Sequence, residues 1–150
     1  MKVAQSPDFL QSVIDAQWAW IAQDGEMPVP LADVFDAVLC LEWDDGGFIF
    51  LTKGEGTVEV HTLFLPKAKN PKACAEQAAA FIFGHGFDRI VTHVPADNRH
   101  ADRLTRRMGF TRTHTEPVAF LRNGIKHDVH HYALVKDDWQ GARECPQQEL

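Results

Sequence analysis

A strand, a capped helix and a glycine turn follow one another between residues 89 and 110, and this segment constrains the fold most. Residues 89–94 alternate in polarity, are rich in β-branched side chains and end at a proline, as a strand does. Residues 98–110 have the spacing Asn-x-x-Ala-x-x-Leu-x-x-Arg-x-Gly-Phe, which is typical of a short helix. Asp97 or Asn98 can cap its first turn, and Gly109 stands where a left-handed helix end is usually needed.

The rest of the chain has the periodicity of one α/β domain. Proline-led starts and apolar spacing predict helices from about residue 7 to 21, over 31–36 and over 71–83. Alternation predicts strands over 37–43, 48–52, 57–65, 110–122 and 125–135, with hairpin signals at Asp45-Gly46 and Asn123-Gly124. We expect the domain to cover residues 1–136 and residues 137–150 to form a loose tail.

Two strands separated by a helix predict a parallel pair at the centre of the sheet. The strand 57–65 is followed by the helix 71–83 and then by the strand 89–94. A crossover helix of this kind joins parallel neighbours. We therefore expect 57–65 to lie centrally and to splay from 89–94 at its far end.

Composition excludes several classes of function. The 150 residues carry a net charge of −6, which argues against a general nucleic-acid binder because such proteins need a basic face. No apolar run is long enough to span a membrane, and the N-terminus has no signal-peptide pattern. The three cysteines lack metal-type spacing and are typical of free thiols in a cytoplasmic protein; they are Cys40, Cys74 and Cys145.

The order of these elements, together with the segment 89–110, resembles the GNAT superfamily of acyltransferases. The likeness covers about residues 7–135, and the recognisable motifs lie between 57 and 110. The segments His61–Pro66 and Val94–Arg99 are also similar to GNAT-like proteins of tailed bacteriophages. The resemblance implies a single GNAT-like domain of the α/β (α+β) class. Its mixed, mostly antiparallel central sheet would be flanked by helices on both faces.

The resemblance also implies a function and a cofactor. GNAT enzymes move an acyl group from coenzyme A to an amine, so the implied activity is an acetyl-CoA- or acyl-CoA-dependent N-acyltransferase with an unidentified amine acceptor. The alternative is a non-catalytic GNAT-fold protein that serves binding or structure, in a phage or elsewhere. Neither the acceptor nor the oligomeric state follows from the sequence.

The cofactor would lie along the end of the strand 57–65 and on the loop that follows it. The family holds the pyrophosphate on glycine-rich backbone there, whereas this loop has no glycine and carries three lysines before a helix start with free amides. A solvated lysine cluster is the alternative. The predicted cofactor-binding residues on this side are Leu63, Phe64, Leu65, Lys67, Lys69, Asn70, Lys72 and Ala73.

The later helix supplies two more candidates for the cofactor. Arg103 belongs to a stripe with Arg99 and Arg107 that either grips phosphates or is a solvated face. Asn98 matches an asparagine that the family places near the cofactor, although a helix cap explains it equally well.

Transfer needs a base for the attacking ammonium and a proton for the departing thiolate. Glu59 and His61 lie two apart and so share one face of their strand, where the family places a glutamate base. Cross-strand pairing, or a buried histidine whose hydrogen bonds are satisfied, is the structural alternative. At the position of the family's tyrosine acid this chain has Thr105, and its only tyrosine, Tyr132, lies in the last strand.

The histidines of the last strand do not predict a metal site. His130 and His131 point to opposite faces by strand alternation, so they cannot bind one ion together. A pairwise site from His127 and His131 is conceivable, but a polar, half-exposed strand explains them better. We predict no resident metal.

Overall fold

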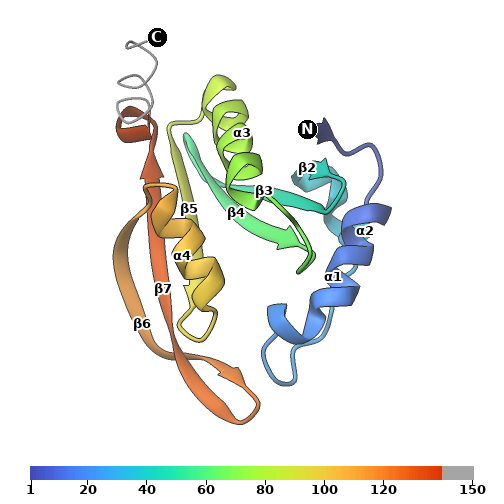
Figure 1. Cartoon of the computed structure of the whole chain (residues 1–150), viewed down its shortest axis with the longest axis vertical. Helices are drawn as coiled ribbons and strands as arrows, with labels where there is room; N and C mark the ends of the chain where they lie inside the picture. The colour runs from blue at the N-terminus through green and yellow to red at the C-terminus, as the bar shows by residue number, and fades with distance from the viewer. Residues whose placement is uncertain (140–150) are drawn as a thin grey trace.

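The computed structural model describes residues 1–139, and its elements follow the predicted order (Figure 1). The helices are α1 (Asp8–Ile21), α2 (Leu31–Val34), a 3-10 turn (Phe35–Ala37), α3 (Pro71–Gly84) and α4 (Arg99–Arg107). The strands are β1 (Lys2–Val3), β2 (Leu39–Trp43), β3 (Gly46–Gly54), β4 (Thr57–Phe64), β5 (Arg89–Pro95), β6 (Thr111–Arg122) and β7 (Ile125–Val135). The two-residue β1 escapes the sequence prediction, because so short a strand has no periodicity. The helical turn at residues 136–139, where a loose tail was expected to begin, escapes it as well.

Local sequence explains where α3 and α4 begin and end. The Oδ1 atoms of Asn70 and Asn98 accept the amide hydrogens of Ala73 and Ala101, at 3.3 and 3.2 Å, so each asparagine caps its helix. Gly109 follows α4 with φ +94°, the left-handed conformation that a side chain disfavours. The predicted Asn98 cap and the predicted glycine turn are confirmed.

The seven strands form one mixed sheet in the order β1-β2-β3-β4-β5-β7-β6. All neighbouring strands are antiparallel except β4 and β5, which run parallel as predicted. Their pairing covers only Thr57 to Glu59 against Arg89 to Val91. Beyond it β4 follows β3 while β5 follows β7, and the two strands diverge (Figure 1).

Helices cover both faces of the sheet, as the resemblance implies. On one face Val58 and Val60 pack with α3 and with Met108 and Phe110 after α4. On the other face Leu63 packs with α1 and α2. We call these the α3 face and the α1 face. Burial on both faces makes β4 the central strand of the core.

The tip of the β6–β7 hairpin is fastened to the loop after α1. The Asp24 carboxylate accepts the amide hydrogens of Asn123 and Gly124, at 2.9 and 2.8 Å. These bonds lower the pKa of Asp24 below its ordinary value. Asn123 and Gly124 both have positive φ, which is the type of turn that the Asn-Gly signal predicts.

A buried arginine completes this fastening. The Arg122 side chain is 7% exposed and donates through Nη1 to Asp97 Oδ2 at 2.7 Å. Its Nη2 donates to the carbonyl of Trp20 at the end of α1. Arg122 therefore links β6 to α1 and to the turn before α4, three segments that are distant in sequence.

The described chain continues in contact with the core beyond residue 136. The Trp139 ring lies 5.4 Å from that of Phe83, between ring centroids. Residues 140–150, the rest of the predicted tail, lie outside the described residues. No helix within residues 1–139 has the length and apolarity needed to cross a membrane.

Replacing Arg122 with methionine should destabilise the protein strongly, because it leaves the partly buried carboxylate of Asp97 without the arginine cation. Removing one partner of a buried ion pair typically costs about 3–5 kcal/mol. Urea unfolding of Arg122→Met should show this loss.

Arg106→Met is the matched control, because the Arg106 side chain is 62% exposed and its partner Asp102 keeps Tyr132 and Arg112 as neighbours. The loss of such an exposed arginine costs at most about 1 kcal/mol. Equal losses in both variants would contradict the assigned role.

Candidate active site

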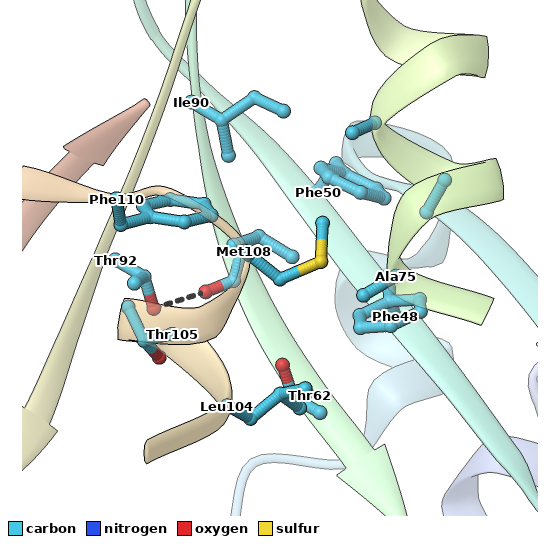
Figure 2. Close-up of a pocket in the computed structure, with 13 residues that line it drawn as sticks. Phe48, Phe50, Thr62, Ala75, Ile90, Thr92, Leu104, Thr105, Met108 and Phe110 are labelled. Atoms are coloured by element: carbon cyan, nitrogen blue, oxygen red, sulfur yellow. Dashed lines mark hydrogen bonds between the residues drawn. The ribbon is translucent and has the colours of Figure 1, made fainter. Parts of the chain in front are cut away.

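A cavity opens on the α3 face where β4 and β5 part. It has a volume of about 50 Å³. The polar groups at its wall include Thr62, Thr92 and Thr105, and its remaining lining is apolar: Phe48, Phe50, Val60, Ala75, Ala78, Ala79, Ile90, Leu104, Met108 and Phe110. Met108 extends from the end of α4 toward Phe50 and α3 (Figure 2). The cavity has room for a few water molecules, so a larger ligand needs Met108 to move.

The edge of β4 that faces this cavity has backbone groups turned toward the gap. Thr92 Oγ1 donates to the carbonyl of Val60 at 3.0 Å, so the polar groups of Val60 point toward β5 (Figure 2). Backbone direction alternates along a strand, so those of Thr62 and Phe64 point the same way, where β5 has departed. Leu65 points back, and its amide donates to the carbonyl of Asp45 at 2.9 Å.

This alternation sorts three of the predicted cofactor residues. Phe64 can offer backbone groups to an extended ligand in the gap. Leu63 is buried in the core of the α1 face and, with Leu65, turns its backbone toward β3. Their contribution to a cofactor site stays a prediction.

Glu59 and His61 meet on the α1 face, directly at the point where the strands part. His61 Nε2 lies 2.9 Å from Glu59 Oε2. A third group, His93 of β5, brings Nδ1 to 3.8 Å from Glu59 Oε1, and Lys53 Nζ is 3.9 Å from the same oxygen. The rings of His61 and His93 are 5.8 Å apart across the gap, between centroids. Sequence reasoning found the first two residues and missed His93, which reaches Glu59 only because the strands are parallel neighbours.

Burial lowers the pKa of the His93 imidazole, and the Glu59 carboxylate partly opposes that shift. Two neighbouring imidazoles, His61 and His131, also lower the His93 pKa. Because the pKa in the folded protein lies below the ordinary value of 6.5, His93 is neutral at pH 7 and can accept a proton. The associated stability is present above pH 6.5 and is lost as the pH falls through the lowered pKa.

The loop after β4 is cationic, but its helix start is less open than predicted. Lys67, Lys69 and Lys72 are all exposed, and Lys72 Nζ pairs with Glu76 at 3.3 Å. The prediction that the Ala73 amide is free is wrong, because the Asn70 cap already accepts its hydrogen. A phosphate here would have to displace that cap or rely on the lysines.

The candidates on α4 divide in a similar way. Asn98 serves as the helix cap, and the exposed Arg103 extends the arginine stripe on the outer side. Thr105 lines the cavity, but its hydroxyl donates to the carbonyl of Ala101 at 2.7 Å. This bond, in addition to the weak acidity of threonine, makes Thr105 a poor proton donor for a leaving group.

Tyr132 is engaged by other side chains, and the thiols of the described cysteines have raised pKa values. Tyr132 is buried, donates its hydroxyl hydrogen to Asp102 and accepts one from Arg112 at 3.0 Å. Burial raises the pKa of the Tyr132 hydroxyl, and the bond to Asp102 adds to the shift. Burial likewise raises the pKa of the Cys40 thiol to about 11 and raises that of Cys74. Neither thiol is an activated nucleophile.

Nuclear magnetic resonance titration in metal-free buffer should give His93 a midpoint below 6.5. Glu59→Gln should lower that midpoint further, because it removes the carboxylate that favours the imidazolium. Glu55→Gln, in the turn before β4, makes the same charge change away from His93 and should leave the midpoint unchanged. A midpoint above 6.5, or one insensitive to Glu59→Gln, would mean that His93 is not in the environment described.

The comparison with known proteins rests on structure alone. No protein-family model and no curated protein sequence matches this chain. A spermidine N-acetyltransferase from Vibrio cholerae, solved with CoA and spermine, matches with a TM-score of 0.76 at 15% identity, over 92% of this chain and 95% of that one. A GNAT-family protein from Chromobacterium violaceum matches with a TM-score of 0.67 at 14% identity, over 93% and 83%. The structural neighbours are thus GNAT-family N-acetyltransferases, and this chain has the GNAT fold.

Proposed function

We propose that this protein is an acyl-CoA-dependent N-acyltransferase that transfers the acyl group directly to an amine. The observation that carries the proposal is the gap between β4 and β5. An apolar cavity lies at the gap on the α3 face, and a carboxylate with two imidazoles lies there on the α1 face. A thioester in the gap would be accessible from both faces.

The cofactor would approach from the α3 face. Its pantetheine arm carries amides, which can pair with the outward backbone groups of Thr62 and Phe64 as a third strand would. Its phosphates would lie near Lys67, Lys69 and Lys72, in the field of the α3 N-terminus. The neighbour from Vibrio cholerae, which was solved with CoA, supports acyl-CoA as the cofactor.

The acceptor amine would approach from the α1 face. Glu59, through His61 or His93, would take a proton from the ammonium, so that the nitrogen lone pair can attack the thioester carbonyl. The new C–N bond forms as the C–S bond breaks, and the coenzyme leaves as a thiolate. A thiolate is a good leaving group, so transfer proceeds without a dedicated acid, but more slowly. The Vibrio cholerae enzyme, solved with spermine, makes a small amine a reasonable acceptor class.

The second candidate is a GNAT-fold protein that binds without catalysis. Two observations favour it: the Thr105 hydroxyl is engaged by Ala101, and the Asn70 cap occupies the Ala73 amide. Both weaken functions that the family's tyrosine and glycine loop supply. The two candidates differ in acyl-CoA binding and turnover, and each can be measured.

Ala75→Leu should abolish acetyl-CoA binding, because the larger side chain fills the cavity beside α3. With acetyl-CoA at about one hundred times its dissociation constant, the wild-type protein should gain about 2.7 kcal/mol of stability. This gain would be visible as a higher melting temperature. Ala80→Leu, on the exposed side of the same helix, should keep that gain. An acetyl-CoA shift that survives in Ala75→Leu would place the cofactor elsewhere.

Glu59→Gln combined with His61→Ala should lower the rate of CoA release by roughly 10²–10⁴-fold, the usual contribution of acid–base help. Free thiol can be followed with a chromogenic reagent over a panel of small amines. Glu55→Gln serves again as the charge-matched control and should keep the wild-type rate. Acetyl-CoA binding without turnover on any amine would favour the binding protein, whereas turnover unaffected by the double variant would move the base to another group.

A further inference from the structure

We propose that His114, Glu116 and His131 form a binding site for a divalent transition-metal ion such as Zn²⁺. This site is separate from the proposed acyl-transfer function and does not depend on it. It lies on the α1 face at the other edge of the sheet, on the neighbouring strands β6 and β7. His114 and His131 are directly opposite in the strand register, and Glu116 follows His114 by two residues.

The three side chains converge in space. One possible ligand atom from each residue lies within 4.8 Å of the other two. The rings of His114 and His131 are stacked, with centroids 4.2 Å apart and planes 9° from parallel. The Glu116 carboxylate contacts Nε2 of His131. Imidazole lone pairs lie in the ring plane, so binding needs the two rings to rotate out of this stack. Such rotations would bring nitrogen and oxygen atoms at these separations to about 2.0–2.2 Å from the ion, the distances that zinc requires.

The neighbouring residue Thr113 orients the His114 ring. Thr113 Oγ1 lies 3.1 Å from His114 Nδ1 and donates to the carbonyl of His131 at 3.3 Å. Because Thr113 engages Nδ1, Nε2 of His114 is the nitrogen available to an ion. Histidines that bind metals usually have such a hydrogen bond at the ring nitrogen that does not bind the ion.

The chemistry of the set defines the class of ion. Two imidazoles and one carboxylate suit zinc, cobalt or nickel, whereas magnesium and calcium prefer sites made entirely of oxygen. Three protein ligands leave at least one coordination position for water or another small ligand. A third imidazole lies beside the site on the same face: the ring of His93 is 5.6 Å from that of His131, between centroids. An ion here would therefore place positive charge on β6 and β7, with β5 between it and the strand that carries Glu59.

Two measurements on the full chain, without acetyl-CoA, test the site. Zn²⁺ in excess should raise the melting temperature by several degrees, and Mg²⁺ should not, because only an ion that binds the folded state stabilises it. Co²⁺ should give the visible absorption of a four- or five-coordinate ion. His114→Ala and Glu116→Gln should each weaken binding at least tenfold, since even the loss of an outer contact costs about 10–100-fold.

His130→Ala is the matched control for non-specific binding. His130 neighbours His131 in sequence but belongs to the opposite face of β7, so its loss should leave Zn²⁺ and Co²⁺ binding unchanged. Circular dichroism verifies that each variant is folded. The proposal is overturned if wild-type protein shows no Zn²⁺ shift, if the ligand variants bind as tightly as His130→Ala, or if Co²⁺ remains six-coordinate. Each result concerns the metal alone, so the acyl-transfer proposal stands or falls separately.

Discussion

The early end of the pairing between β4 and β5 determines the rest of this structure. The two strands share three register pairs and then follow different partners, β3 and β7. Parallel strands that stay together would bury their backbone groups in a continuous ladder. Here the ladder stops at Glu59 and Val91, which leaves one edge of β4 open. The apolar cavity and the group formed by Glu59, His61 and His93 both lie at this opening, on opposite faces of the sheet.

Signals that act within a few residues predicted most of the fold. Asn98 caps α4, Gly109 ends it in the left-handed conformation, and Asn123 begins the turn of the last hairpin. The alternation along β4 placed Glu59 and His61 together on one face, and their side chains do interact. These features depend on local backbone geometry, which is written in consecutive residues.

Contacts between strands were harder to predict, because register and bulges are set by the whole sheet. His131 was compared with His127 on its own strand, yet its partner is His114 on β6, next to an irregularity in the register. His127 instead lies 3.6 Å from Asp97, between Nε2 and Oδ2. No spacing along one strand gives such cross-strand neighbours, and the role of Arg122 was missed for the same reason.

The Asp24 clasp on the hairpin turn has a consequence for the order in which the chain folds. Its bonds join residues 99 and 100 positions apart, so they close about two thirds of the 150-residue sequence into a loop. Such contacts stabilise the chain only after the entropy of closing that loop has been lost. In contrast, α3 and the β3–β4 hairpin form from residues that are close in sequence. The clasp should therefore close late and open early. The side of the molecule where α1 meets the β6–β7 hairpin would then unfold locally while the central strands remain paired.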